Sequence, residues 1–231
     1  MKTLLEVKNL TVNLDGEKVL ENLSFSVSEE EILTILGPNG AGKSVLLKTL
    51  LGLLPYEGEI LWHRKPKIGY LPQGLNQLSV KNYPLTVADF FALKNPAPSL
   101  EEITKFLLLV GLEKDILDKT AGNLSSGQFQ RMLVAWVLIS HPQIIFFDEP
   151  TTGIDIGGGE TIYSLLNTIW KKEKLTMLLV THDLSIVYKH STNVLCLTRK
   201  RHSCYGAPKE ILNTKILEQV FGTEIKIYEH K

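Results

Sequence analysis

The fold is decided by the stretch Ile32-Leu33-Thr34-Ile35-Leu36-Gly37-Pro38-Asn39-Gly40-Ala41-Gly42-Lys43-Ser44. It opens with an apolar run that contains β-branched residues, which predicts a buried parallel strand ending at Gly37. Beyond the glycines, residues 43–54 carry leucines and a valine at helical spacing, so a helix is expected there. A strand, a glycine-rich turn and a helix in this order predict an α/β fold with a phosphate-binding loop.

Residues 37–44 match the pattern G-x-x-x-x-G-K-[ST], known as the P-loop, and each residue type has a chemical reason to be there. Glycines let the backbone N–H groups curl around a phosphate, and the following helix presents its positive N-terminus to the anion. Lys43 is expected to reach the β- and γ-phosphates, and the Ser44 hydroxyl to bind Mg²⁺. The predicted nucleotide-contacting residues of the loop are Gly37, Pro38, Asn39, Gly40, Ala41, Gly42, Lys43 and Ser44.

A second buried strand is expected at residues 144–147, and it ends in the acidic pair Asp148 and Glu149. Two carboxylates at the carboxyl end of a buried strand are costly unless something binds them. Alone, the pair is equally consistent with an ordinary solvated strand end. With a P-loop in the same chain, Asp148 is expected to bind Mg²⁺, directly or through water, and Glu149 to act as the base that polarises the attacking water.

The segments around these two strands predict the rest of the architecture. Residues 3–10 and 23–27 are expected to be strands of a small antiparallel sheet, with the turn Asp15-Gly16 between them. Residues 177–181 predict a third buried strand. Strands that alternate with helices indicate a parallel α/β sheet.

Helices are expected at residues 100–111, 113–119 and 130–140. Prolines interrupt the chain between residues 76 and 123, so this part is interpreted as a mostly helical insertion. Three consecutive glycines at 157–159 favour a flexible loop before a further helix.

Composition limits the possible classes of protein. Lys+Arg and Asp+Glu are both 25, so no excess positive charge indicates nucleic-acid binding. No uninterrupted apolar stretch is long enough to span a bilayer and no signal peptide is expected, so any membrane role is predicted to come through a partner. The two cysteines, Cys196 and Cys204, are too few for a disulfide scaffold and are expected to be free thiols.

Between the two phosphate-site motifs lies Leu124-Ser125-Ser126-Gly127-Gln128, which resembles the LSGGQ signature of the ABC-transporter ATPases. Gln73 resembles the Q-loop glutamine of that family, Asp155 its D-loop aspartate and His182 its switch histidine. These elements follow the family's order over almost the whole chain. The chain is therefore identified as a member, and the resemblance implies a P-loop NTPase (RecA-like) core with an antiparallel β subdomain and a helical signature-motif subdomain.

The resemblance implies a single ABC ATPase domain over residues 1–231. Its catalytic lobe is expected at about 1–74 and 129–206, and its helical lobe at about 75–128. Residues from about 207 to 231 are expected to form a C-terminal appendage.

The resemblance also implies how the site works, with ATP and Mg²⁺ as its ligands. The signature residues would face the γ-phosphate held by a second copy, so hydrolysis would need a homodimer. The Mg²⁺ contacts would come from Ser44, Gln73 and Asp148. His182 would contact the γ-phosphate, although a lone histidine after a strand is also often an ordinary core or loop residue.

Three positions depart from the family pattern. Leu14 stands where the family usually has an aromatic residue that stacks on adenine, so the base is expected to rest on an aliphatic surface. Ser126 replaces the first glycine of the signature, which is expected to be tolerated because Gly127 is kept. The D-loop has Gly153-Ile154-Asp155 in place of the common Ala-Leu-Asp.

Softer signals concern the cargo. Tyr83-Pro84-Leu85-Thr86-Val87 is similar to an element of zinc- and manganese-type ATPases, and so are the tail segments 194–197 and 204–208. The resemblance implies import of a transition metal through a separate membrane permease, with an extracytoplasmic substrate-binding protein, at the cytoplasmic face of the cell membrane. Importers of iron chelates share part of these signals and remain an alternative.

Leu75, Leu78, Tyr83, Phe90 and Phe91 are candidates for an apolar groove that receives the permease, or for simple packing of the helical insertion. Other classes are disfavoured. A soluble ABC ATPase acting on ribosomes or DNA would usually carry a second ATPase half or long coiled coils, and a P-loop kinase would have no reason for a signature motif.

Overall fold

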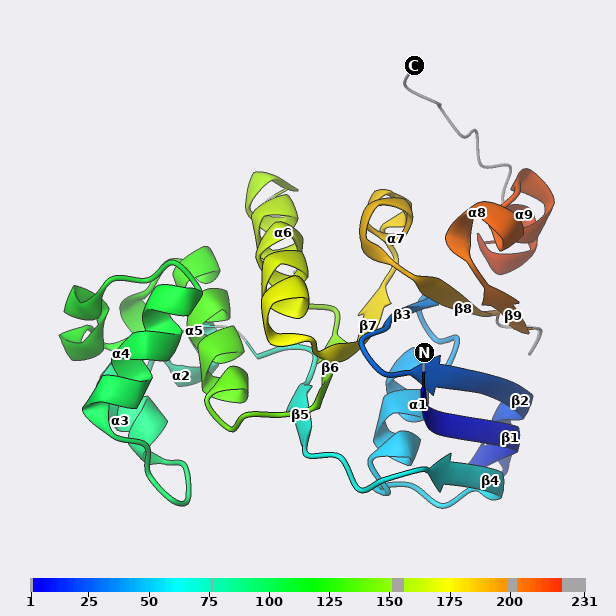
Figure 1. Cartoon of the computed structure of the whole chain (residues 1–231), viewed down its shortest axis with the longest axis horizontal. Coiled ribbons are helices and arrows are strands. Elements are labelled where there is room, and N and C mark those ends of the chain that lie inside the picture. Colours follow the sequence, from blue (N-terminus) through cyan, green and yellow to red (C-terminus); the bar gives the residue numbers. More distant parts are fainter. Residues whose placement is uncertain (1, 76, 151–155, 199–202, 222–231) are drawn as a thin grey trace. The chain divides into compact units, whose positions relative to one another are not determined.

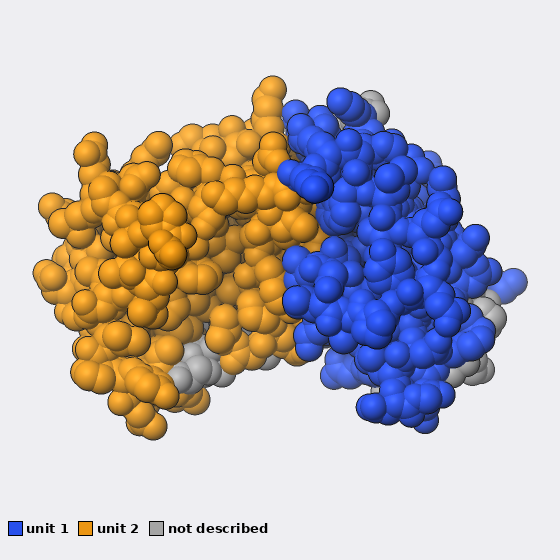
Figure 2. All heavy atoms as spheres, turned by 90° about the horizontal axis from the view of Figure 1, so that it is seen from below, with its two compact units in different colours: residues 1–65, 176–231 blue, residues 66–175 orange. Residues whose placement is uncertain are grey.

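The computed structural model describes residues 2–75, 77–150, 156–198 and 203–221 (Figure 1). The chain divides into two compact units, Met1–Lys65 with Thr176–Lys231 (unit 1, blue) and Pro66–Leu175 (unit 2, orange), as Figure 2 shows. Each unit is described here by itself. The boundaries of the catalytic lobe, the helical lobe and the C-terminal appendage stay a prediction.

Unit 1 contains a three-stranded antiparallel sheet in the order β2-β1-β4. Its strands are β1 (Thr3–Leu14), β2 (Glu17–Ser28) and β4 (Glu57–Trp62). The predicted turn at Asp15 and Gly16 is confirmed, and both residues have the positive φ angles, 50° and 85°, that a tight hairpin requires. The strands are longer than predicted because the ladder continues to the turn through the buried pair Val12 and Leu20 and through the polar pair Asn13 and Lys18.

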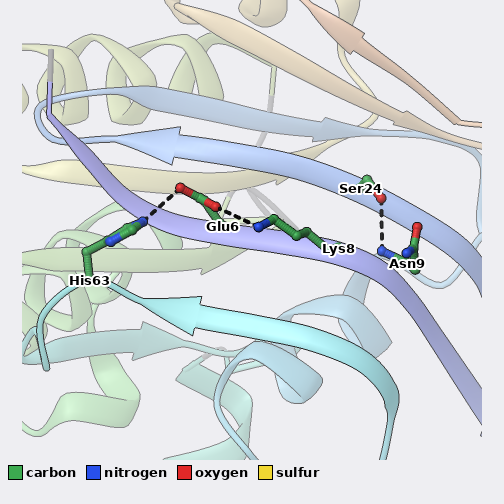
Figure 3. A network of polar contacts seen from close by, with 5 residues as sticks. All are labelled: Glu6, Lys8, Asn9, Ser24 and His63. Carbon is green, nitrogen blue, oxygen red and sulfur yellow. Dashed lines mark hydrogen bonds and ion pairs between the residues drawn. The ribbon is translucent and has the colours of Figure 1, made fainter.

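The outer surface of this sheet carries a network of polar side chains (Figure 3). His63 Nε2 lies 2.9 Å from Glu6 Oε1, and Lys8 Nζ lies 3.3 Å from the other carboxylate oxygen. The backbone N–H of Asn9 donates to Ser24 Oγ at 2.9 Å. Hydrogen bonds from His63 and Lys8 lower the pKa of the Glu6 carboxyl below its ordinary value.

The second sheet of unit 1 has β3 (Ile32–Leu36) at its centre, flanked in parallel by β7 (Thr176–Thr181) and β8 (Asn193–Leu197). Strand β9 (Ser203–Gly206) joins β8 in antiparallel orientation. Every residue of β3 is buried, including Thr34, as its largely apolar run with β-branched residues predicts. The helices of the unit are α1 (Lys43–Leu50), α7 (Leu184–His190), α8 (Pro208–Ile211) and α9 (Thr214–Phe221).

Helix α1 begins where it is predicted but ends at Leu50, four residues early. Gly52 has a φ of 73°, its N–H donates to the Thr49 carbonyl at 2.9 Å, and the Leu53 N–H donates to the Lys48 carbonyl at 2.9 Å. This is the Schellman pattern that ends helices at a glycine. The spacing of the leucines alone therefore predicts a helix that is too long at its C-terminal end.

The expectation of two free thiols is wrong. A disulfide joins Cys196 to Cys204, whose Cα atoms lie 4.9 Å apart. The two residues face each other directly in the β8–β9 ladder, because the antiparallel register pairs Cys196 with Cys204. A cysteine count carries no information on this register.

Unit 2 pairs β5 (Ile68–Leu71) with β6 (Ile144–Asp148) in parallel. Its helices include α4 (Leu100–Leu109) and α5 (Ser126–Leu138), both near their predicted positions, whereas the predicted helix at 113–119 is the 3₁₀-helix η1 (Lys114–Asp118). The remaining elements are α2 (Gln77–Val80), α3 (Val87–Ala92), η2 (Ala121–Asn123) and α6 (Ile156–Glu173).

The glycines at 157–159 do not form a loop, contrary to the expectation, because they belong to the start of α6. Later in this helix, Ile162, Tyr163, Leu166 and Ile169 are buried at helical spacing. Burial of this apolar stripe outweighs the poor helix propensity of three glycines.

In the part of the chain that the structure describes, we find no helix with the length and apolar character needed to cross a membrane.

Candidate nucleotide-binding site

The P-loop connects β3 to α1 in unit 1, as the strand-turn-helix pattern predicts. Gly40 and Gly42 have φ angles of 81° and 90°, a left-handed conformation that glycine adopts at no steric cost. Gly42 is the N-cap of α1 and offers no side chain to the first N–H groups of the helix. The positive end of α1 therefore faces the loop with its backbone donors uncapped by a side chain.

Two further contacts explain the glycines at 37 and 42. A Cβ on Gly37 would lie 2.4 Å from the backbone oxygen of Leu197, so only glycine fits against β8. A Cβ on Gly42 would lie 2.8 Å from Leu20 Cδ2 and 3.1 Å from Val19 Cγ1, so the first hairpin packs closely against the end of the P-loop. The loop is held tightly at both ends.

Lys43 is the first residue of α1 and is only 6% exposed. Its ammonium group donates to the carbonyl oxygens of Gly37, at 2.9 Å, and Pro38, at 3.2 Å. The side chain therefore folds back over the loop and places its charge inside the curve of residues 37–42. Ser44 follows at the half-buried second position of the helix.

His182 follows β7 directly and is exposed. Because β7 runs parallel to β3 with Thr181 opposite Leu36, the next residues in register are His182 and Gly37. The loop after β7 is shaped by Asp183, which caps α7 by accepting a hydrogen bond from the Ser185 N–H at 2.8 Å. Unit 1 thus brings His182 to the same sheet edge as the start of the P-loop.

Unit 2 has an equivalent edge, formed by the carboxyl ends of β5 and β6. The register pairs Leu71 with Phe147, so two residues further on the strands reach Gln73 and Glu149. The Gln73 amide donates to Glu149 Oε2 at 2.8 Å, which fixes the direction of this carboxylate. Glu149 also has a φ of 51°, a conformation rare for non-glycine residues and often found at functional positions.

Asp148 is the last residue of β6 and is 3% exposed. Tyr70 lies on the neighbouring strand, opposite Phe146. Burial, together with the negative charge of Asp148, raises the pKa of the Tyr70 hydroxyl above its ordinary value. The end of β6 therefore carries a nearly buried carboxylate, that of Asp148, followed directly by the oriented carboxylate of Glu149.

The signature residues surround the N-terminus of α5. Ser125 is its N-cap, and its hydroxyl oxygen accepts the Gln128 N–H at 3.2 Å, while the Gln128 side chain accepts the Ser125 N–H at 3.1 Å. Leu124 is buried and anchors this corner, whereas Ser125 is exposed and Ser126, Gly127 and Gln128 are half-buried. A Cβ on Gly127 would meet no atom within 4 Å, so packing within the unit does not require glycine there.

The structure thus brings the predicted residues together in two groups. Leu14, at the half-buried end of β1, belongs to unit 1 with the P-loop and His182. Gln73, Asp148, Glu149 and the signature residues belong to unit 2. The D-loop residue Asp155 lies outside the described residues.

Sequence reasoning missed Val19 and Leu20, the hairpin residues nearest to Gly42. A weak signal was present, because Val19 continues the alternation of Leu23, Phe25 and Val27 towards the start of the second predicted strand, whereas Leu20 is out of phase with it. Their proximity to the P-loop depends on how the hairpin folds over it, which no local pattern shows.

The residues 20–152 match the family model described as ABC transporter. The chain is 38% identical over its whole length to the zinc import ATP-binding protein ZnuC of Wigglesworthia glossinidia brevipalpis, and the alignment covers 99% of that protein. It is 39% identical to a probable metal transport system ATP-binding protein of Thermotoga maritima, with 94% of this chain and 90% of that protein aligned.

Solved structures give the same result. An ABC transporter assigned to the metal-chelate type, in an inward-facing conformation, aligns with a TM-score of 0.84 at 26% identity over 96% of this chain and 90% of that chain. The cbiO1 protein of Clostridium perfringens, part of an ABC transporter complex, aligns with a TM-score of 0.79 at 30% identity over 91% of each chain. The predicted membership and α/β P-loop fold are therefore confirmed, and this chain belongs to the ABC transporter family of ATP-binding proteins.

Proposed function

We propose that this chain is the ATP-hydrolysing subunit of an ABC importer, and that it energises the uptake of a transition metal, zinc or manganese, through a separate membrane permease. Two full-length relatives support this reading, since one is named a zinc import protein and the other a metal transport protein. The observation that carries the ATPase assignment is the Gln73–Glu149 hydrogen bond at the ends of two parallel strands. It gives a carboxylate a fixed direction beside a buried second acid.

Unit 1 carries the residues proposed to bind phosphate. The uncapped N–H groups at the start of α1 and the left-handed glycines form a concave row of donors for phosphate oxygens. Lys43 already lies over this concavity and would exchange its two carbonyl contacts for the β- and γ-phosphates. His182, in register with Gly37, would donate to the γ-phosphate.

Unit 2 carries the proposed acid–base residues. Glu149 would accept the proton of the attacking water, and Gln73 holds its carboxylate in one orientation for that purpose. The residue types also suit Mg²⁺, because Gln73 and the buried Asp148 offer oxygen atoms in unit 2 and Ser44 offers a hydroxyl oxygen in unit 1. When bound, Mg²⁺ would neutralise the phosphate charge that develops during transfer.

The signature residues are proposed to act on the nucleotide of a second copy, in a homodimer. The Ser125 hydroxyl uses a lone pair to accept the Gln128 N–H, so its own proton remains free to donate to an anion. Gly127 has open space at its Cα, which suits the close approach of a phosphate from outside the unit. Both features would let the signature residues contact a phosphate group held by a second copy of the chain.

The permease is proposed to dock on exposed apolar residues that follow the Q-loop. Leu75, Leu78 and Tyr83 are large apolar side chains that are 41%, 66% and 60% exposed. Phe91 does not belong to this surface, because it is fully buried, and Phe90 stacks edge-on against Trp136 inside the unit. The docking would place the chain at the cytoplasmic face of the membrane, with a substrate-binding protein on the opposite side.

Cellular metal content tests this function. Source cells with wild-type protein or Lys43→Ala are grown with limiting metals, and zinc, manganese and iron are measured by elemental analysis. A selective fall of zinc or manganese in Lys43→Ala cells is expected. Unchanged metals, with ATPase activity retained by the purified wild type, would contradict metal import but not the ATPase assignment.

A second candidate cargo is an iron chelate, favoured by the similarity to the transporter of the metal-chelate type. The same measurement separates the two, because loss of an iron-chelate importer lowers iron while zinc and manganese stay constant. A chain with no transport role, such as a soluble ABC ATPase, would leave all three metals unchanged.

A further inference from the structure

The disulfide lies next to the P-loop. Strand β8 pairs with β9 through Cys196 and Cys204, and on its other side it pairs with β3 through Cys196 and Leu36. Leu36 is the last residue before the P-loop. Gly37 then passes so close to the Leu197 carbonyl that no Cβ would fit. Cys196 therefore directly precedes Leu197, whose carbonyl group packs against the start of the P-loop.

The β9 side of the disulfide also reaches the nucleotide region. Ser203, next to Cys204, lines a small cavity together with Val19, Leu20 and Ala41, the last of which is a P-loop residue. Any displacement of β9 relative to β8 thus changes the surroundings of the P-loop at a second point.

Strand β9 has attachments besides the disulfide, including its ladder with β8. The Tyr205 hydroxyl donates to the Ser26 backbone oxygen at 2.7 Å. Cys204 of β9 also packs against an apolar cluster that contains the buried residues Leu212, Leu217 and Val220. Breaking the bond is therefore expected to relax the strand pair rather than to unfold it.

We propose that Cys196 and Cys204 form a reversible thiol–disulfide site that regulates ATP binding at the neighbouring P-loop. The inference rests on the proposed ATP-binding function. Disulfides of intracellular proteins are usually transient or redox-sensing rather than structural, which agrees with the proposed placement of this chain in the cytoplasm. Bonded sulfur atoms are about 2 Å apart, whereas non-bonded heavy atoms need about 3.5 Å, so the two states impose different spacings on β8 and β9.

The reduction uses two molecules of a small thiol such as glutathione. The first, as a thiolate, attacks the half-buried sulfur of Cys204, and the S–S bond breaks so that Cys196, which is 1% exposed, leaves as a thiolate and takes up a proton. The second thiolate attacks the small-molecule sulfur of this mixed disulfide and releases Cys204, which also takes up a proton. Two electrons pass to the protein, and the reductant leaves as its own disulfide.

The test compares the two states of the purified full chain without any substitution. The protein is equilibrated in glutathione buffers of graded potential, free thiols are counted by maleimide labelling and mass spectrometry, and the Kd of a fluorescent ATP analogue is measured with Mg²⁺. In the oxidised form the disulfide fixes β8 and β9 beside the P-loop. This form is expected to bind the analogue at least about threefold more tightly than the reduced form, because a preorganised site loses less conformational freedom on binding.

Substitutions provide the controls. Cys204→Ser is expected to abolish the dependence of Kd on the redox buffer, whereas Tyr205→Phe, which removes the anchor on Ser26 but keeps both thiols, is expected to retain it. Equal Kd values for fully oxidised and fully reduced wild type would overturn the proposal, and so would thiols that remain reduced in the most oxidising buffer. Absence of analogue binding in both states, equal to that of Lys43→Ala, would overturn the proposed function and this inference with it.

Discussion

Replacing Gly37 by alanine tests the placement of the P-loop against β8. The added Cβ would lie 2.4 Å from the Leu197 backbone oxygen. Because non-bonded heavy atoms lie about 3.5 Å apart at their energy minimum, one of the two backbones has to move by roughly an ångström. Neither can yield by rotating a side chain, since both β3 and β8 are held in the sheet by parallel pairing.

Over-packing of a core costs about 1–3 kcal/mol, and a clash with backbone belongs at the upper end, so we expect about 3 kcal/mol. For a chain of 231 residues each kcal/mol shifts Tm by about 2–4 °C. Gly37→Ala should therefore lower Tm by about 6–12 °C in calorimetry without nucleotide.

Gly127→Ala is the matched control. Its Cβ would meet no atom within 4 Å, and the residue lies in the first turn of α5. Alanine is favoured over glycine in a helix by about 0.5–1 kcal/mol, so Tm should rise by about 1–4 °C. A Gly37→Ala protein that melts within about 2 °C of wild type, or a Gly127→Ala protein that is equally destabilised, would refute the steric reasoning.

Glu149→Gln should bind ATP-Mg²⁺ without hydrolysing it and accumulate as a dimer in gel filtration; a protein that stays monomeric would count against the proposed homodimer. Phe91→Ala should lower the free energy of unfolding in urea by about 3–5 kcal/mol, because the ring is fully buried, while the exposed Leu78→Ala should change it by less than about 0.5 kcal/mol. Similar losses for both would contradict the assignment of Phe91 to the core. The lowered pKa of Glu6 predicts a stabilisation that is present above its unfolded value of 4.5 and is lost as the pH falls through the lower folded pKa. The Tm of Glu6→Gln should therefore lie below that of wild type at neutral pH, and the two Tm values should converge in acid. A Tm difference that is constant with pH would show that the contacts with His63 and Lys8 have no electrostatic part.

The central strands could be predicted from the sequence because their signal is local. The boundaries of β3 are as predicted, and those of β6 and β7 differ by one residue each, because each strand is a short, mainly apolar run that ends at a glycine, an acid or a threonine. Strands β4 and β5 were not predicted. β4 is largely exposed and β5 has four residues, so their pairing partners rather than their own composition make them strands.

In the candidate site, too, the local sequence predicts some features, whereas others depend on the tertiary structure. Motif spacing identifies which residue types belong together, but the hydrogen bond between Gln73 and Glu149 depends on the parallel register of β5 and β6. Likewise, only the β8–β9 register joins Cys196 to Cys204. Phe90 and Phe91 are adjacent and chemically identical, and only tertiary packing decides that Phe91 is the fully buried one.

The hydrogen bond from Gln73 to Glu149 has a thermodynamic consequence. Gln73 is two residues from Leu75, which opens the surface proposed for the permease, so a permease that shifts this segment also shifts the proposed catalytic carboxylate. Linkage between two binding sites is reciprocal. If permease docking strengthens ATP binding by about tenfold, ATP must strengthen permease docking by the same factor. The affinity of the membrane subunit for this chain would then depend on which nucleotide is bound.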